Sequence, residues 1–408
     1  MNELTSLGLI LLLALLAGHL VRVVRIPEVS GYLIAGVALG PSLLGWLSQD
    51  NLVSLGVFSE VALGLILFSV GSVFEVSLFR RMGRQLMILT LIESALAAAA
   101  VTIGALVLGQ PWQVSFLLGA IAIATAPAST LMVIRECDSA GPLTDNLLGI
   151  IAINNLLCIT AYSLVAAMID LTAGAGGSAG FATTLYNASF SLIWQLVGSV
   201  ALGFLVGLLL ASWSSHVVEN GEMLILLAGS ILLCVGVSRF LELSPLVASL
   251  SVGATLVNLA HRSRHLFEAL VLTDPPFYAI FFVIAGAELD VRLIPAMGAL
   301  GLVYIVGRAG GKFVGARLGA RWLGLEPSVQ NLLGFALLAQ AGLAVGLTFA
   351  INARYESYAA VISTVVLASV TVYEMIGPVS TRFALVRAGE AGRAKQPATD
   401  SLLVAQPD

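Results

Sequence analysis

The sequence has little charge and little cysteine. Only 10% of its residues are charged, whereas an ordinary soluble domain has about 25%. This scarcity excludes a soluble globular protein, and the formal net charge of -4 gives no sign of nucleic-acid binding. The three cysteines and four histidines have no spacing typical of a metal site or a disulfide framework. The sequence has no nucleophile-base pair or phosphate loop, so we expect neither an enzyme nor a cofactor.

Hydrophobic runs dominate what is present. The chain is 59% hydrophobic with a mean hydropathy of +1.01. A bilayer core of about 30 Å needs about 20 apolar residues in a helix, so the runs predict an all-α polytopic membrane protein. Thirteen candidate spans cover 4–24, 28–46, 52–76, 86–109, 112–135, 143–169, 186–213, 222–240, 245–260, 272–289, 295–317, 328–351 and 358–385.

The basic residues predict the orientation of these spans, because loops rich in Lys and Arg stay in the cytoplasm. Most of the 19 fall on one side, including Arg22, Arg25, Arg80, Arg81, Arg84, Arg135, Arg262, Arg264, Arg317, Arg321, Arg382, Arg387, Arg393 and Lys395. The other side has only Arg239, Arg292 and Arg354. We therefore expect the N-terminus outside and the C-terminus in the cytoplasm.

Two segments of the sequence repeat each other. Residues 71–78 read G-x-x-x-E-V-x-L and residues 286–293 read G-x-x-x-D-V-x-L, an offset of 286 − 71 = 215. The same offset relates Thr125 to Gln340 and Glu93 to Arg308. An odd number of predicted spans separates the copies, so the halves would be inverted, as in secondary transporters. Chance remains the alternative for the letters of the first match alone.

Two predicted spans contain helix-breaking residues at matching positions. Pro127 lies mid-span within ATAPAST, where it removes a backbone donor. Gln340 and Gly342 interrupt the twelfth span, since glycine weakens a helix. Freed backbone groups at membrane depth must line a cavity or find partners. With the hydroxyls of Thr125 and Ser129, the breaks predict a cation-binding element; a structural proline kink is the alternative.

Four charged residues lie within predicted spans: Glu93, Arg308, Lys312 and Glu374. Each costs roughly 2.5 to 3.5 kcal/mol at a helix centre on insertion scales, and together they sum to zero. We expect an ion pair between Glu93 and Arg308. Lys312, four residues after Arg308, either shares its inward face or extends to the cytoplasmic interface.

Several stretches together resemble the bacterial sodium/hydrogen exchanger type of cation-proton antiporter. They are RIPEVSGYLIAGVALGPSLLG, ALGLILFSVGSVFEVSLFRR, IATAPASTLMVIRECDSAGPLTDNLLGIIAI, PPFYAIFFVIAGAELDV and GRAGGKFVGARLGARWLG. The resemblance implies a homodimer of thirteen-helix protomers in a bacterial inner membrane. It implies a mobile core domain in which the fifth and twelfth spans are unwound and cross, and exchange of protons for Na+ or K+.

The resemblance also divides the chain. It implies a transporter domain at 1–385, with inverted repeats at about 28–169 and 245–385 joined by linker spans at 186–240. From 386 to 408 the polar composition predicts a disordered cytoplasmic tail.

One position departs from the family pattern. The sixth span of the family has a short pair, usually Asp-Asp or Asn-Asp, that supplies the essential carboxylate. Here the pair is Asn154-Asn155, and an amide has no proton to exchange near pH 7. The implied Na+ or K+ site near Thr125, Asn154 and Asn155 therefore lacks its acid.

Four accounts of this departure stay open. The chain is an engineered charge-neutral variant, or a natural antiporter that uses Glu93 or Glu374 as the carrier. Alternatively, Arg308 and Lys312 favour an anion or small carboxylate as substrate. The last account is a membrane sensor that has lost transport.

Overall fold

The computed structural model describes residues 3–71, 76–172, 181–214, 216–217, 220–259 and 274–394. Its secondary structure in these ranges is helical, which confirms the predicted all-α class. The helices are α1 (Glu3–Val23), α2 (Glu28–Leu39), α3 (Gln49–Gly71), α4 (Val76–Val107), α5 (Trp112–Ala122), α6 (Pro127–Glu136), α7 (Pro142–Thr172), α8 (Phe181–Ser214), α9 (Asn220–Phe240), α10 (Pro245–Leu259), α12 (Asp274–Glu288), α13 (Leu293–Ala296), α14 (Gly298–Trp322), α15 (Pro327–Ala336), α16 (Gly342–Arg354) and α17 (Glu356–Arg387).

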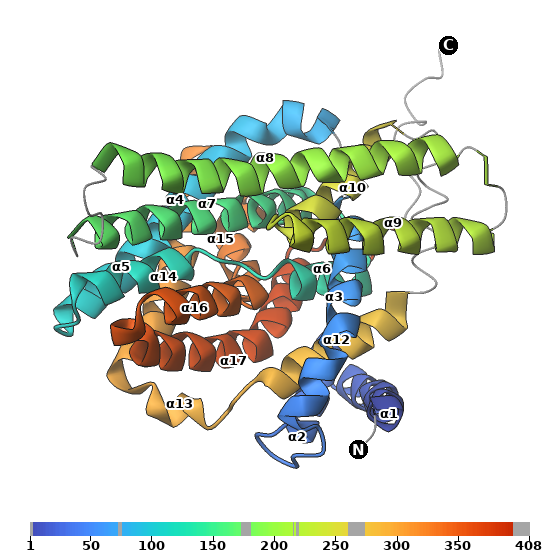
Figure 1. Ribbon diagram of the computed structural model, residues 1–408, viewed down its shortest axis with the longest axis horizontal. Coiled ribbons are helices and arrows are strands. Elements are labelled where there is room, and N and C mark those ends of the chain that lie inside the picture. Colours follow the sequence, from blue (N-terminus) through green and yellow to red (C-terminus); the bar gives the residue numbers. More distant parts are fainter. Residues whose placement is uncertain are drawn as a thin grey trace, which may run out of the picture.

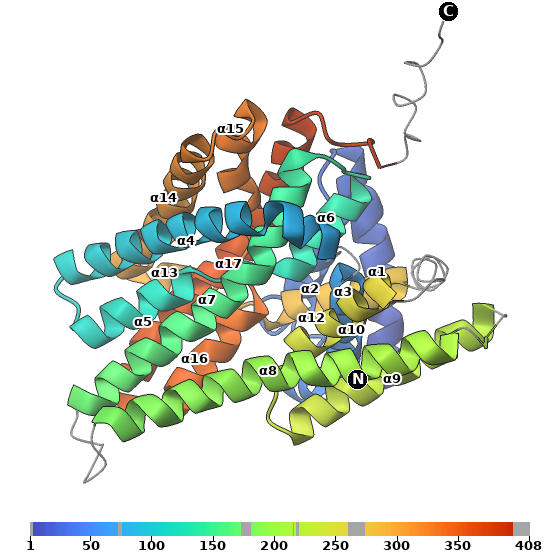
Figure 2. The same cartoon turned by 90° about the horizontal axis from the view of Figure 1, so that it is seen from above.

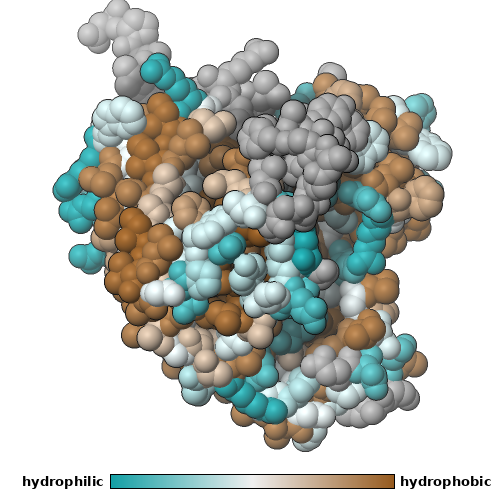
Figure 3. Space-filling view, turned by 60° about the vertical axis from the view of Figure 1, so that its left-hand side comes forward, coloured by the Kyte–Doolittle hydropathy of each residue, from teal (hydrophilic) through white to brown (hydrophobic). Residues whose placement is uncertain are grey.

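Many of these helices are suited to a bilayer. Eight of the described helical segments are long and apolar enough to cross a membrane, and four shorter apolar helices accompany them. Large hydrophobic side chains are exposed along them, and brown residues cover much of the face in Figure 3. The chain is therefore a multi-pass membrane protein. The number of thirteen spans stays a prediction.

The helices form two bundles that lie side by side (Figures 1 and 2). We call α4–α7 and α14–α17 the site bundle, because its helices pack mainly on one another. We call α1–α3, α8–α10 and α12 the flanking bundle, for the same reason. The long helix α8 runs along one side of the molecule in Figure 2 and packs on both α10 and α7.

Both predicted helix breaks are present. The first separates α5 from α6, which begins at Pro127, and the second separates α15 from α16, which begins at Gly342. Proline is favoured at the first position of a helix because its missing N–H has no intrahelical partner there. The two breaks meet where the Ala126 N–H donates to the Ala339 carbonyl at 3.0 Å. The predicted crossing is thus confirmed.

The flanking bundle is built from helix pairs that join the two halves of the sequence. An ideal Cβ on Gly286 of α12 would lie 2.3 Å from the Leu33 carbonyl oxygen of α2. An ideal Cβ on Gly71 of α3 would lie 2.3 Å from the Leu250 carbonyl oxygen of α10. Glycine at each crossing permits this backbone contact. The repeated motif therefore marks equivalent contacts, although Glu75 lies outside the described residues.

The boundary of the predicted tail needs a correction. Residues 388–394 follow α17 and lie against the turn between α6 and α7, where the Gly392 N–H donates to the Cys137 carbonyl. The Glu390 carboxylate accepts the N–H groups of Leu143 and Thr144 at 2.7 and 2.8 Å, at the start of α7. Their polar composition predicts a disordered tail. These residues are ordered instead, because Glu390 caps the N-terminus of α7, whose first N–H groups have no partner within the helix. Residues 395–408 lie outside the described ranges.

Candidate functional site

The site begins with the contact between α4 and α14, which run antiparallel. An ideal Cβ on Gly315 would lie 2.5 Å from the Cα atom of Glu93, and one on Gly311 would lie 2.5 Å from the Cα atom of Ala97. Small residues four apart let two membrane helices approach closely. This approach sets Glu93 of α4 next to the face of α14 that carries Lys312.

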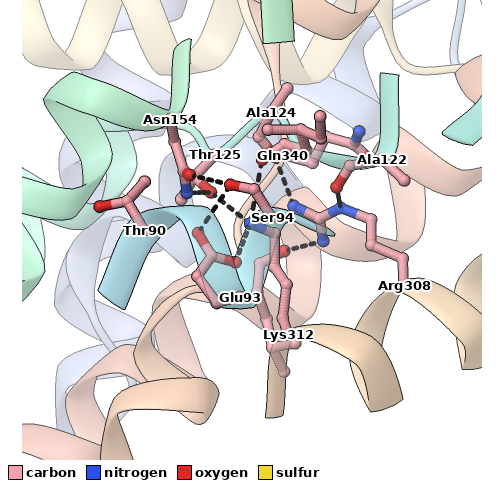
Figure 4. Close-up of polar contacts among 12 residues, drawn as sticks. Thr90, Glu93, Ser94, Ala122, Ala124, Thr125, Asn154, Arg308, Lys312 and Gln340 are labelled. Atoms are coloured by element: carbon pink, nitrogen blue, oxygen red, sulfur yellow. Dashed lines mark hydrogen bonds and ion pairs between the residues drawn. The ribbon is translucent and has the colours of Figure 1, made fainter. Parts of the chain in front are cut away.

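Glu93 and Lys312 form a fully buried ion pair (Figure 4). The Lys312 ammonium lies 3.1 Å from Glu93 Oε2 and also donates to the Ile123 carbonyl and the Thr125 hydroxyl, both at 3.0 Å. An ammonium has three N–H donors, so all three are used. The oxygens come from a carboxylate on α4 and from the break between α5 and α6.

The predicted pairing of Glu93 with Arg308 is therefore wrong. The Arg308 guanidinium instead donates to four backbone carbonyls of the two breaks, those of Ala122, Ala124, Leu338 and Ala339, at 3.1, 2.7, 2.7 and 3.3 Å. Unwound segments leave carbonyls that need donors at membrane depth, and the planar fork of arginine reaches several at once. The interfacial position considered for Lys312 is wrong too, because its side chain is 0% exposed.

The two asparagines of α7 have different surroundings. Asn154 is buried; it donates to the Thr125 hydroxyl at 3.0 Å and accepts the Ser94 hydroxyl at 2.7 Å. Asn155 is partly exposed, and its side-chain oxygen has no hydrogen-bond partner among the residues that the structure describes. Asn154 thus holds Thr125 toward Lys312, and Asn155 keeps an acceptor oxygen available.

The remaining predicted residues lie around the breaks. Gln340 is buried and donates to the Ile121 carbonyl at 3.0 Å and to the Tyr304 hydroxyl at 2.8 Å. The Ser129 hydroxyl, two residues after Pro127 in α6, is buried and has no hydrogen-bond partner within the described ranges. Gly342 begins α16 and is exposed. The structure therefore gathers Thr125, Asn154, Glu93 and Lys312 in one network. Among the described residues, the side-chain oxygens of Ser129, Asn155 and Gln340 have no hydrogen-bond partner.

Glu374 is not joined to that network. It is 4% exposed and makes no ion pair with any residue in the described ranges. No group of three or more His, Cys, Asp or Glu residues that could hold a metal ion occurs in the part of the chain that the structure describes.

Three residues of the site were missed from the sequence. Ser94 orients Asn154, Tyr304 accepts a hydrogen bond from Gln340, and the ring of Tyr373 lies 4.3 Å beneath the Arg308 guanidinium carbon. Tyr304 lies four residues before Arg308, a spacing that puts both on one helical face. This spacing could have indicated Tyr304 from the sequence. Ser94 and Tyr373 lie in apolar helices, and nothing in the sequence pattern indicated their roles.

Comparison with known proteins identifies the family. The family described as "Sodium/hydrogen exchanger, transmembrane" matches residues 8–385, nearly the whole chain. The chain belongs to this family. It is thus a multi-pass membrane transporter of the cation-proton antiporter type, which confirms the resemblance seen in the sequence.

Individual relatives of this sodium/hydrogen exchanger chain are distant. It is 25% identical over 341 residues to "Ammonium/H(+) antiporter subunit AmhT" of Alkalihalophilus pseudofirmus, covering 82% of this chain and 83% of the relative. It is 23% identical over 334 residues to "High-affinity Na(+)/H(+) antiporter NhaS3" of Synechocystis, covering 72% and 70%. The solved sodium proton antiporter MjNhaP1 of Methanocaldococcus jannaschii matches 99% of both chains with a TM-score of 0.73 and 18% identity, which shows the fold.

Proposed function

We propose that this chain exchanges a monovalent cation for protons, with the Glu93 and Lys312 pair in place of the missing sixth-span carboxylate. The observation that carries the proposal is the position of the Lys312 ammonium, a monovalent cation surrounded by the oxygens of Glu93, Ile123 and Thr125. A free cation would be stabilised by the same oxygens. The two cations therefore compete for one site.

This competition couples the two fluxes. A protonated Lys312 occupies the oxygens, and a free cation enters only when the lysine releases a proton to water and its neutral amine withdraws. The buried charge on Glu93 is balanced in both states, which matters because an unpaired buried charge is costly. Each bound cation is thus exchanged for one proton from Lys312.

The asparagines have supporting roles in this proposal. Asn154 holds the Thr125 hydroxyl in position, and the unpartnered oxygens of Asn155 and Ser129 are further neutral ligands for the entering cation. Neutral oxygens fit Na+, K+ or ammonium, and the two relatives are named for ammonium and sodium. We keep Na+ and K+ as the expected cations and include ammonium in the test.

The anion alternative loses its basis. It required a basic face on α14 free to bind a carboxylate. Lys312 has its three donors committed, and Arg308 donates to four carbonyls. An anion would have to break these bonds before it found a donor.

We propose that the site bundle moves as one body against the flanking bundle, in an elevator-like alternating-access cycle. The support is that helices of each bundle pack mainly with their own bundle. Two hydrogen bonds between described residues cross from one bundle to the other. Glu136 of α6 accepts the Glu28 N–H of α2 at 2.8 Å, and Arg135 donates to the Tyr278 hydroxyl of α12 at 3.1 Å. These bonds would break and re-form once per cycle.

The setting of the protein is part of the same proposal. We place it as a homodimer in a bacterial inner membrane, with the N-terminus outside and the C-terminus in the cytoplasm. The basic residues support this orientation, including Arg382 and Arg387 near the end of α17. Labelling of single cysteines from each side of sealed vesicles tests the orientation, and cross-linking tests the dimer.

The test of function is proton movement in proteoliposomes, reported by a pH-sensitive dye after addition of Na+, K+ or ammonium. The expected result is cation-dependent proton movement by the natural sequence and its loss in Glu93→Gln. The matched control is Glu356→Gln, an exposed acid in the first turn of α17, which should transport normally. Equal proton movement by Glu93→Gln and the natural sequence would refute the role of Glu93. No movement with any cation would refute antiport.

A further inference from the structure

A second buried carboxylate, on Glu374, is unexplained by the exchange site. It lies in the middle of α17, is 4% exposed, and its Oε2 atom has no hydrogen-bond partner in the described part of the chain. Acidic residues are almost never fully buried unless they are paired. An acid that keeps an unpartnered oxygen inside the protein therefore needs a functional account.

The register of α17 places Glu374 beside the start of α16. Thr381, seven residues later, donates to the Ala336 carbonyl at the end of α15, and Ser363, eleven residues earlier, donates to the Asn352 side chain of α16. Seven and eleven residues are each close to whole numbers of helical turns, so all three side chains share one face. On the same face, an ideal Cβ on Gly377, three residues after Glu374, would lie 2.6 Å from the Ala339 Cα atom, just before Gly342 begins α16.

The start of α16 is a suitable neighbour for an acid that gains and loses a proton. The first amides of a helix lack intrahelical partners and form its positive end, which stabilises a carboxylate. Gly342 is exposed, and an ideal Cβ there would meet nothing within 4 Å. This open space leaves an approach to the helix end that Glu374 faces.

The charges around Glu374 come from a few helices. The nearest on α14 are Arg308, which lies over the ring of the adjacent Tyr373, and Lys312, one turn further. Helices α5, α13 and α15 have no acidic or basic residue. The acids and bases of α2 and α6 are at helix ends, where Glu136 pairs with Arg382, two turns beyond Glu374. Arg354 ends α16 at its far end and pairs with Asp170.

We propose that Glu374 is a second proton-binding site, which takes up and releases one proton per transport cycle through water at Gly342. When the site is open, the carboxyl O–H bond breaks and the proton passes to water. The carboxylate left behind is stabilised by the positive N-terminal end of α16. On the other side of the membrane, water returns a proton to the same oxygen. This inference rests on the proposed function, because it concerns the same cycle.

The inverted repeat shows why this acid is informative. The offset of 215 relates Glu374 to Ile159 of α7 and Gly342 to Pro127. The first half therefore has an isoleucine where the second half has a carboxylate. The chain lacks an acid at Asn155 and has one instead in the helix related to α7 by the repeat.

The first experiment measures the protonation of Glu374 directly, by infrared difference spectroscopy of the detergent-solubilised protein between roughly pH 5 and roughly pH 9, above the usual carboxyl pKa. The expected result is a protonated-carboxyl band that disappears as the pH rises and is absent from Glu374→Gln. Glu356→Gln is the matched control and should keep the band. The same band in Glu374→Gln would overturn the proposal. This measurement needs no transport, so it decides the inference even if antiport fails.

The second experiment measures the proton-to-cation ratio in proteoliposomes, from the cation gradient at which net proton movement stops under a clamped membrane potential. The expected result is a loss of one proton per cation in Glu374→Gln, with cation-dependent flux retained. An unchanged ratio would overturn the proposal. If Glu374→Gln does not fold, Gly342→Leu is the second variant, since it fills the open space at the water entrance. It should slow proton exchange at Glu374, whereas Gly346→Leu, also in open space, should not.

Discussion

Lys312 Nζ lies 3.1 Å from Glu93 Oε2, and both side chains are 0% exposed. Each charge therefore stabilises the other in the buried site. The contact joins α4 to α14 at the break in the fifth predicted span, where the same ammonium bonds to Ile123 and Thr125. This relationship leads to the first prediction.

Removing one partner of the pair should cost much more stability than removing both. We expect Glu93→Gln and Lys312→Met each to lower the free energy of unfolding by about 3 to 5 kcal/mol, because each leaves a buried charge unpaired. The double variant should recover much of this loss and remain inactive in transport. Unfolding of the purified protein in detergent measures all three. Additive losses in the double variant would contradict the pairing.

Enlarging Gly315 should separate the helices that carry the pair. An added methyl group would lie 2.5 Å from the Glu93 Cα atom, a backbone atom that cannot move aside alone. We expect Gly315→Ala to lower the free energy of unfolding by about 1 to 3 kcal/mol, as overpacking does, and to slow cation-dependent proton movement. Gly310→Ala on the same helix is the matched control, because its added methyl would meet nothing within 4 Å. Equal effects of both variants would count against the close contact.

An acid at Asn155 should change the exchange. Its amide oxygen has no partner, so Asn155→Asp adds a carboxylate without breaking a described hydrogen bond of that oxygen. We expect stronger cation-dependent proton movement and tighter apparent cation binding, since a carboxylate neutralises a cation and an amide does not. Proteoliposome assays over a range of cation concentrations measure both. Unchanged proton movement and apparent cation affinity in a folded variant would contradict the proposal that Asn155 lines the cation site.

The Glu390 carboxylate should stabilise the start of α7. It accepts the N–H groups of Leu143 and Thr144 and the Thr144 hydroxyl, at 2.7, 2.8 and 2.6 Å. We expect Glu390→Ala to lower the free energy of unfolding by about 0.5 to 2 kcal/mol, the usual effect of losing a helix cap. Thermal unfolding in detergent measures the loss. Glu356→Ala, at an exposed site, should have a smaller effect, and a larger one there would argue against the cap.

The sequence predicted the breaks because their causes are local. Pro127 cannot continue a helix, and Gly342 weakens one, wherever they lie in the fold. The partner of Glu93 could not be predicted in the same way. Arg308 and Lys312 share a face of α14, and the close approach of α4 at Gly315 selects the lysine. That approach depends on tertiary packing, which cannot be predicted from the 215-residue spacing of the sequence repeat.

Two further features were beyond the sequence for the same reason. The role of Glu390 depends on where the chain goes after α17, and composition alone predicted a disordered tail. The difference between Asn154 and Asn155 depends on Ser94 and Thr125, which come from other helices. Adjacent identical residues cannot be told apart without the neighbours that each one meets.

The Arg308 guanidinium ties together two chain segments that enter the membrane interior from different helices. Its bonds to Ala122, Ala124, Leu338 and Ala339 satisfy carbonyls that hydrocarbon could not. Because these partners lie within one bundle, they stay together however that bundle moves. In the elevator-like cycle proposed above, the polar centre would then cross the bilayer without opening a continuous water-filled path. An exchanger of this kind would resist leakage of ions down their gradients while it works.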